Sequence, residues 1–283
     1  MIPASIPAFA LGLCDDAAVF PPGLVPLTDA VPAHRRHRSA PYAKLVGPLV
    51  LPATALDDLY RLLGSGEPLD LSVTAPDGPC EAAKALATAA DLPVDLHGLE
   101  VAVPPGMRPD EFFRVLGPVP VPLYVEVPRD DRRAAMIAAI AARGHRAKFR
   151  TGGVKANLYP STDELAAAVK AVVESGVPFK ATAGLHHPVR NTDRETGFHQ
   201  HGFLNLLLAT DAALEGRPLP DLAAILGDRD APSIASRVAR LGEARTIAAR
   251  AHFLSFGTCS ITDPMTELAD LGLLASALQE TAR

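Results

Sequence analysis

The chain has 283 residues, of which 48% are hydrophobic and 21% charged, a composition that supports one large core and excludes disorder. Its net charge is −5 and no long basic face is present, so nucleic-acid binding is not expected. No apolar run is long enough for a spanning helix, and the N-terminus lacks the positive segment of an export signal. These features predict a cytoplasmic protein without membrane partners.

Residues 1–43 precede the regular pattern of the chain. They are expected to form a loop and a helix that close one end of the fold, while residues 44–283 form the main domain. Asp15 and Asp16 stand just before the prolines of VFPPG. They either cap a turn ahead of those prolines or lie close to a functional site, where they would bind a cation or close over it.

From residue 44 onward a short β-branched run, a polar turn and a helix repeat six times. Ser161 and Glu164 mark one helix start clearly, because they have the spacing of a capping box. Alternating strands and helices predict right-handed crossovers and a parallel sheet. We therefore predict a TIM-type (β/α)8-like barrel, with an open doubly wound sheet as the alternative. The expected strands lie within 44–52, 69–76, 94–104, 121–128, 145–153 and 177–184.

The pattern becomes irregular after the sixth expected strand. Residues 203–216 predict the sixth helix and residues 250–261 a late strand, but the residues between them look helical. No clean seventh strand can be located, so the barrel is either irregular here or carries a helical insertion. An Ala/Leu-rich helix expected from Met265 to Leu278 makes a homodimer reasonable.

Two of the six lysines in the chain lie inside expected strands, close to the strand ends. Because side chains alternate along a strand, Lys148 shares a face with Arg150, and Lys180 shares one with Thr182. An ammonium turned toward the helices would be costly to bury, so we expect both lysines to point inward. A buried ion pair with Glu126 is the purely structural alternative.

Ligands of barrel folds bind at the carboxyl ends of the strands, so these cations suggest an enzyme for a small carboxylate or phosphate substrate. In the first hypothesis Lys180 is a nucleophile, its pKa lowered by nearby cations, that forms a Schiff base as in a lyase or aldolase. Glu126 or His201 would carry the proton, and no cofactor is required. The expected substrate-binding groups are Lys148, Arg150, Gly152, Gly153, Arg190, His186 and His187.

The histidines support a second hypothesis. His199 and His201 are two residues apart, so an extended backbone would place both imidazoles on one side. With Glu126, or with Asp193, they would bind a divalent metal in a metal-dependent lyase or hydrolase. A third hypothesis is a barrel without catalytic activity that binds a small anionic molecule.

Several further residues have two interpretations. Cys259 is either a nucleophile or a small buried cysteine, and the three cysteines are too far apart to predict a disulfide framework or a structural zinc site. His97 and Glu100 point to opposite faces of one expected strand, so at most one of them reaches the barrel interior.

Six segments together resemble an uncharacterised family of bacterial proteins with relatives in plants. The resemblance implies no particular activity, substrate or cofactor, but it favours His201 over His199 as the functional histidine. The segments are CDDAAVFPPG (14–23), VGPLVLP (46–52), KFRTGG (148–153), FKATAGLHHPVR (179–190), HGFLN (201–205) and SFGTCSITDP (255–264).

Two shorter resemblances concern the same region. FKATAG (179–184) is similar to the lysine strand of class I aldolases such as deoxyribose-phosphate aldolase. The stretch that begins HQHGFLN resembles the pattern of metal-dependent lyases related to HMG-CoA lyase. It departs from that pattern at Gly202, where those proteins have aspartate or asparagine.

Overall fold

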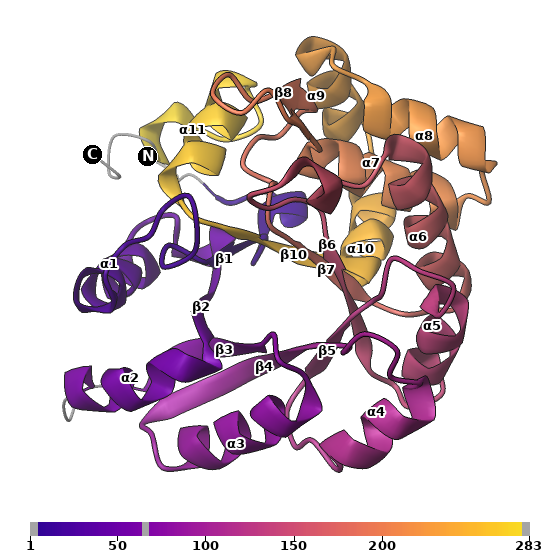
Figure 1. Cartoon of the computed structure of the whole chain (residues 1–283). Helices are drawn as coiled ribbons and strands as arrows, with labels where there is room; N and C mark the ends of the chain where they lie inside the picture. The colour runs from indigo at the N-terminus through magenta and orange to yellow at the C-terminus, as the bar shows by residue number, and fades with distance from the viewer. Residues whose placement is uncertain (1–4, 64–67, 279–283) are drawn as a thin grey trace.

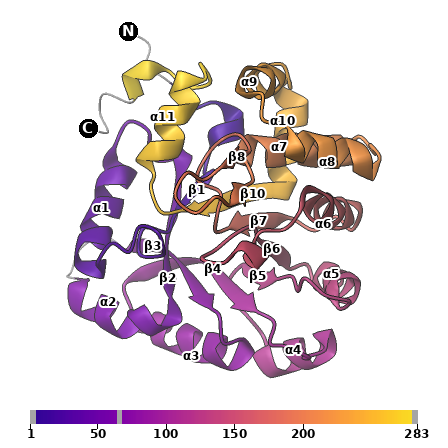
Figure 2. The same ribbon diagram turned by 45° about the horizontal axis from the view of Figure 1, so that its top comes forward.

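A computed structural model of the chain describes residues 5–63 and 68–278. Eight parallel strands close into a barrel in the order β1-β10-β7-β6-β5-β4-β3-β2, and helices surround it (Figure 1 and Figure 2). The predicted TIM-type barrel is confirmed. The barrel strands are β1 (Cys14–Asp16), β2 (Val46–Pro52), β3 (Leu69–Ala75), β4 (Val94–Ala102), β5 (Leu123–Glu126), β6 (Arg146–Arg150), β7 (Phe179–Thr182) and β10 (Phe253–Thr258).

Each of the six expected strands is followed by its expected helix, and the loop after β7 adds a small antiparallel ribbon of β8 (Asn191–Thr192) and β9 (His199–Gln200). No helix in the described ranges combines the length and apolar character needed to cross a bilayer. The helices are α1 (Leu27–Ser39), α2 (Leu56–Leu62), α3 (Pro79–Ala90), α4 (Pro109–Leu116), α5 (Arg133–Ala141), α6 (Thr162–Glu174), α7 (Phe203–Leu214), α8 (Leu219–Gly227), α9 (Ala231–Ala239), α10 (Glu243–His252) and α11 (Thr262–Asp270).

The strand that the sequence pattern lacks is β1, at the other end of the chain. It pairs in parallel with both β10 and β2 and so closes the barrel. Residues 1–43 therefore supply a barrel strand as well as a loop and a helix, which corrects the expectation for this segment. A strand of three residues, two of them aspartates, has no hydrophobic alternation to reveal it. The irregular region contains the helical insertion, α8 and α9.

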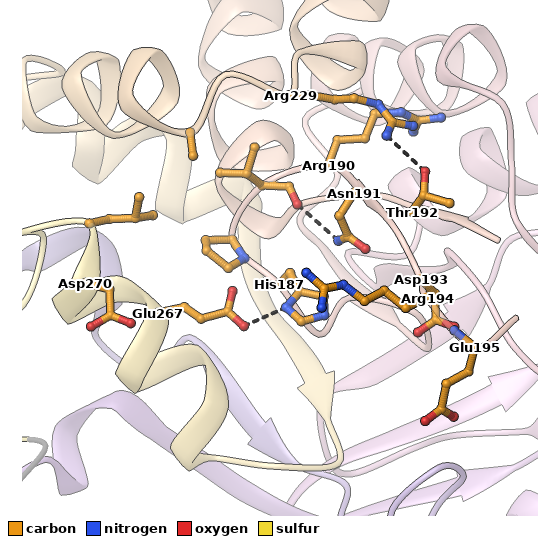
Figure 3. A pocket seen from close by; sticks show the side chains of 14 residues that line it. His187, Arg190, Asn191, Thr192, Asp193, Arg194, Glu195, Arg229, Glu267 and Asp270 are labelled. Atoms are coloured by element: carbon orange, nitrogen blue, oxygen red, sulfur yellow. Dashed lines mark hydrogen bonds and ion pairs between the residues drawn. The ribbon is translucent and has the colours of Figure 1, made fainter. Parts of the chain in front are cut away.

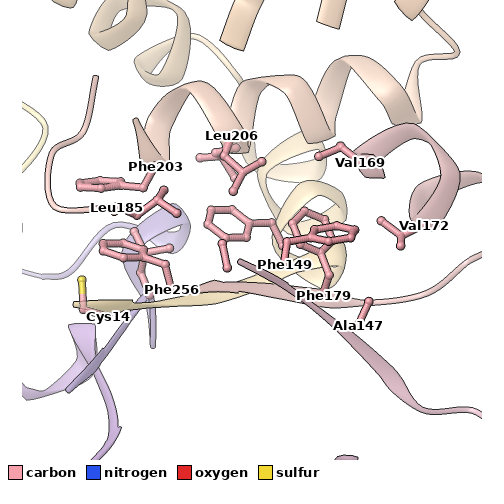
Figure 4. Close-up of a cluster of buried hydrophobic side chains, with 14 of the residues drawn as sticks. Cys14, Ala147, Phe149, Val169, Val172, Phe179, Leu185, Phe203, Leu206 and Phe256 are labelled. Carbon is pink, nitrogen blue, oxygen red and sulfur yellow. The ribbon is translucent and has the colours of Figure 1, made fainter. Parts of the chain in front are cut away.

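The outward faces of β6, β7 and β10 are aromatic and lie beneath α6 and α7 (Figure 4). Phe149 and Phe179 contact each other with ring centroids 5.3 Å apart, and Phe203 of α7 stacks on Phe256 at 4.6 Å. Burying each ring stabilises the fold by about 1.5–3 kcal/mol. Because strand residues alternate, this outward packing turns the two strand lysines into the barrel.

The C-terminal segment packs against its own chain. The helix predicted for residues 265–278 is a shorter helix, α11, followed by a 3-10 turn at Ser276–Leu278. Met265 and Leu268 are fully buried, and Leu274 and Leu278 nearly so. The apolar pattern that suggested a homodimer is therefore satisfied within one chain.

Candidate functional site

A continuous chain of ion pairs crosses the barrel interior. Most of its contacts join strands that are not neighbours in the sheet, such as β4 with β7, so the side chains meet across the hollow of the barrel. We call this set of six residues the ion-pair chain. In order, it consists of Asp15 on β1, Lys180 on β7, Glu100 on β4, Lys148 on β6, Glu126 on β5 and Arg150 on β6.

The contacts in the ion-pair chain are short, and the charges of successive residues alternate between negative and positive. Lys180 Nζ lies 2.6 Å from Asp15 Oδ2 and 2.5 Å from Glu100 Oε1. Lys148 Nζ lies 3.1 Å from Glu100 Oε2 and 3.1 Å from Glu126 Oε2. Glu100 thus gives one oxygen to each ammonium and connects the two lysines.

The ion-pair chain runs from the buried interior to the solvent. The side chain of Lys180 is 2% exposed, that of Lys148 is 6% exposed, and that of Arg150 is 37% exposed. Glu126 and Arg150 are the last residues of their strands. Since ligands reach barrels from the carboxyl ends of the strands, the accessible end of the ion-pair chain faces the side where a substrate would enter.

Neighbouring hydroxyl groups and a glycine hold the buried carboxylates. Ser72 Oγ donates to Glu100 Oε1 at 3.0 Å, and Ser255 Oγ donates to Asp15 Oδ2 at 2.7 Å. A Cβ at residue 47 would lie 2.1 Å from Asp15 Oδ1, so Gly47 leaves the space that this carboxylate occupies. This accounts for the glycine in the VGPLVLP segment.

The electrostatics reverse the sequence-based expectation for Lys180. Burial alone would lower its pKa, but the charges of Asp15 and Glu100 outweigh burial, and the pKa lies above its usual range. Burial would raise the pKa of Glu100, yet Lys180 and Lys148 lower it to about 2. Carboxylates rather than cations contact Lys180 Nζ, so the lowered pKa expected for this lysine is wrong and its side chain is held as an ammonium.

His201 is not part of the ion-pair chain. It is fully buried, donates from Nε2 to the Pro160 carbonyl oxygen at 2.8 Å, and accepts at Nδ1 from Arg190 Nη1 at 3.1 Å. Burial lowers the pKa of the imidazole to about 4, which keeps it neutral. His201 therefore does not join Lys180 as a proton carrier, since both its nitrogens already have partners.

We expect the free energy of unfolding to decrease as the pH is lowered, because the buried imidazole of His201 resists protonation. Its pKa is about 4 when folded and 6.5 in the reference state, so between these values only the unfolded chain binds the proton. The contribution is complete above pH 6.5 and is lost as the pH falls toward 4. Between pH 7 and pH 5, the unfolding free energy from urea titrations should fall by about 2 kcal/mol more in the wild type than in His201→Gln. Equal losses in the two proteins would contradict this assignment.

The other residues expected to bind substrate do not gather around the lysines. His187 Nδ1 lies 2.6 Å from Glu267 Oε1 of α11, and Arg190 lines a different cavity. Gly152 packs against the Tyr159 ring, where a Cβ would lie 2.7 Å from Cε1. Carboxylates already neutralise Lys148 and contact Nε of Arg150, so the predicted anion clamp of Lys148, Arg150 and Arg190 is not assembled.

The turns after β6 and β7 are locked together. Gly153 packs against the side chain of Leu158, and a Cβ on Gly184 would lie 3.0 Å from the Cα of Gly152. Thr151 Oγ1 donates to the carbonyl oxygen of Ala183 at 2.6 Å. The two glycines of KFRTGG thus permit close packing of the turns.

His186 and Cys259 lie together, with Cys259 Sγ 3.5 Å from His186 Nδ1. Burial raises the pKa of the Cys259 thiol and lowers that of the His186 imidazole, so both groups are neutral near pH 7. The thiol is therefore not activated as a nucleophile.

The predicted metal ligands His199, His201 and Glu126 have separate environments. His199 is exposed and contacts Thr192 Oγ1, while His201 is buried and Glu126 belongs to the ion-pair chain. β9 ends at Gln200, so the alternation expected of an extended segment does not reach His201. Within residues 5–63 and 68–278, no three His, Cys, Asp or Glu side chains are grouped to hold a metal ion.

Two buried carboxylates of the ion-pair chain, Asp15 and Glu100, were not among the expected catalytic residues. Glu100 points into the barrel, while His97 of the same strand is exposed and pairs with Asp70. Asp15 also points inward, whereas Asp16 contacts His34 Nδ1 at 3.0 Å on the other face. A single acidic residue within an apolar strand, as in HGLEVAV, is the signal that identifies such a position.

No protein-family model matches the chain, and no curated protein sequence matches it. Similar solved structures include the crystal structure of a candidate fructose-1,6-biphosphate aldolase from Coccidioides immitis. The two chains are 11% identical with a TM-score of 0.36, and the match covers 96% of this chain and 91% of that chain. A likeness at this level says nothing about activity, and the barrel is established by its strand pairing.

Proposed function

We propose that the protein is a lyase of the aldolase type in which Lys148 forms a Schiff base with a small anionic carbonyl substrate. The observation that carries the proposal is the ion-pair chain, which places two lysines of adjacent strands on one shared carboxylate. It lies in the barrel interior, and its most exposed residue, Arg150, ends β6 on the side where barrel enzymes bind their substrates.

The energetics favour a functional role for these charges. Replacing a buried ion-pair network by apolar side chains of similar volume is often neutral or stabilising by about 1–4 kcal/mol. Stability alone therefore does not require charges at Asp15, Lys180, Glu100 and Lys148, provided that all four are replaced together. A set of charges that stability does not require, at the end of the barrel used for catalysis, supports a chemical role.

Lys148 is better placed than Lys180 to react. Its Nζ lies 3.1 Å from each of its two carboxylate oxygens, while Lys180 is held at 2.5 and 2.6 Å and is more deeply buried. Lys148 also neighbours Glu126, the carboxylate closer to the solvent. In this scheme Lys180 is a positioning residue that keeps Glu100 ionised.

The proposed chemistry needs only groups of this chain and the substrate. Lys148 gives a proton to Glu126, and its amine forms a bond to the carbonyl carbon of the substrate. The carbinolamine loses the former carbonyl oxygen as water and becomes an iminium ion, whose positive charge the Glu100 carboxylate stabilises. Protonated Glu126 supplies the proton lost with that water and, again a carboxylate, takes the proton of the substrate's β-hydroxyl as the adjacent carbon–carbon bond breaks, so that one carbonyl product leaves and the electron pair of the bond stays on the enamine. Glu126 then returns the proton to the enamine carbon, and water hydrolyses the resulting iminium ion to the second carbonyl product and the Lys148 ammonium. Among the described residues the guanidinium of Arg150 hydrogen-bonds only through Nε, to Glu126 Oε1 at 3.0 Å, so its terminal nitrogens would bind the anionic group.

Reduction with borohydride in the presence of aldehydes and keto acids tests this proposal. We expect a covalent adduct whose mass equals that of the reduced Schiff base, and peptide mapping should place it on Lys148. Lys148→Met should abolish trapping, whereas Lys84→Met, which removes an exposed lysine of α3, should not. An adduct on Lys180 would refute the assignment to Lys148. Absence of any adduct across the panel would refute Schiff-base chemistry.

A further inference from the structure

A cavity of about 680 Å³ lies at the rim of the barrel, apart from the ion-pair chain (Figure 3). Its walls are the loop after β7, the turn between α8 and α9, and helix α11. None of the residues of the ion-pair chain lines it. Its volume is typical of sites that bind small molecules.

Three arginines line this cavity without carboxylate partners in the described part of the chain. Arg190 contacts the imidazole of His201, and Arg229 donates to Thr192 Oγ1 at 2.9 Å, while Arg194 is exposed. Burial and the charge of Arg229 both lower the pKa of Arg190, so the two guanidinium groups repel each other. Like charges gathered at a cavity are stabilised when an anion binds between them.

The contacts of Arg190 preserve its positive charge. His201 gives its only N–H to Pro160 and is left with a neutral acceptor nitrogen toward Arg190. This contact fixes the guanidinium in direction but does not neutralise it. The charge remains available to a ligand.

A single buried amide holds both arginine-bearing segments. Asn205 Oδ1 accepts from the backbone N–H of Arg190 at 2.9 Å, and its Nδ2 donates to the carbonyl oxygens of Ile225 and Asp228 at 2.8 Å each. Asp228 directly precedes Arg229. The HGFLN segment, through His201 and Asn205, therefore positions the cations of this cavity.

We infer that this cavity binds the phosphate group of a small phosphorylated molecule. Two or three guanidinium groups match the charge and the oxygen geometry of a phosphate monoester. Four carboxylates also line the cavity, Asp193, Glu195, Glu267 and Asp270, of which Glu267 pairs with His187, and together they would repel a second anionic group. A ligand with one phosphate fits this charge distribution better than a polyphosphate. No residue of this site takes part in the proposed Schiff-base chemistry.

Calorimetric titration with inorganic phosphate and with glycerol phosphate tests the inference, with sodium chloride at equal ionic strength and glycerol as controls. We expect both phosphates to bind and to raise the melting temperature beyond the effect of chloride. The double variant R190Q/R229Q should weaken binding by about tenfold or more, and Arg229→Gln alone, at an exposed position, should weaken it measurably. Arg240→Gln, at an exposed arginine of the α9 C-terminus, should bind as the wild type does.

Lys148→Met separates this inference from the proposed function. It should lose borohydride trapping but retain phosphate binding. No phosphate binding beyond the chloride control would overturn the site, as would undiminished binding in R190Q/R229Q. Binding that is lost in Lys148→Met but kept in R190Q/R229Q would place the anion at the ion-pair chain and would also overturn it.

Discussion

Replacing Glu100 with glutamine is expected to lower the free energy of unfolding by about 3–5 kcal/mol. The Glu100 carboxylate contacts the ammonium groups of both Lys148 and Lys180, and its side chain is fully buried. An amide of the same shape removes one negative charge and leaves the two cations with too few partners inside the barrel. Urea unfolding at pH 7, followed by circular dichroism, would measure the loss.

Glu164→Gln is the matched control for this substitution. Glu164 also accepts from two cations, Arg129 and Arg133, but it lies at the surface with its side chain 27% exposed. Its loss should cost about 1 kcal/mol or less. Adding Lys148→Met to Glu100→Gln removes one of the uncompensated charges and should recover part of the stability.

The effect of Glu100→Gln should also depend on pH. The folded pKa of Glu100 is about 2 and its reference value is 4.5, so the carboxylate stabilises the fold fully above pH 4.5 and loses this contribution as the pH falls toward 2. The difference between wild type and variant should narrow over this window. Equal free energies of unfolding for the two proteins at pH 7 would show that the Glu100 carboxylate does not stabilise the buried ammonium groups of Lys148 and Lys180.

Gly202→Ala is expected to destabilise the protein by about 3 kcal/mol, the upper end of the usual cost of overpacking. A Cβ at residue 202 would lie 2.5 Å from the Pro188 carbonyl oxygen and 2.3 Å from Asn205 Oδ1. The Pro188 oxygen also accepts the N–H of Leu204 at the start of α7, so it cannot move freely. Thermal unfolding would measure the loss of stability.

The same substitution should weaken phosphate binding, because it displaces the amide of Asn205 that aligns the segments of Arg190 and Arg229. Gly227→Ala serves as the control, since its Cβ would meet nothing closer than Thr162 Cγ2 at 3.8 Å. At such a compatible position, alanine stabilises by about 0.4–1 kcal/mol. A Gly202→Ala protein as stable as the wild type would contradict the close packing described for this glycine.

The fold was predictable because its signals are local. Each of six strands is followed by a helix within the length of one βα unit, and period-two apolar runs identify strands wherever they are long enough. Ser161, predicted to cap α6, accepts the backbone N–H of Glu164. β1 could not be recognised, because its three residues contain two aspartates whose roles depend on strands β7 and β10 and on helix α1.

The alternation of side chains along a strand also predicted that Lys148 and Lys180 point into the barrel. It did not predict the direction of the pKa shift of Lys180. Lys180 and Glu100 are 80 residues apart, and their strands are not neighbours in the sheet. Only closure of the barrel brings this carboxylate to the ammonium, and the contact changes the expected direction of the pKa shift. We therefore propose Lys148 and not Lys180 as the nucleophile.

The histidines that follow β7 show the same difference between what the sequence predicts and what the tertiary structure decides. The sequence alone identified candidate functional residues between Lys180 and His201, because residue types and their spacing are properties of the sequence. It did not reveal that His201 points away from the lysines toward Arg190, since the direction of a loop side chain depends on packing with distant segments. Local periodicity thus determined the barrel and the inward cations, whereas the partners of each charge depended on contacts across the barrel interior.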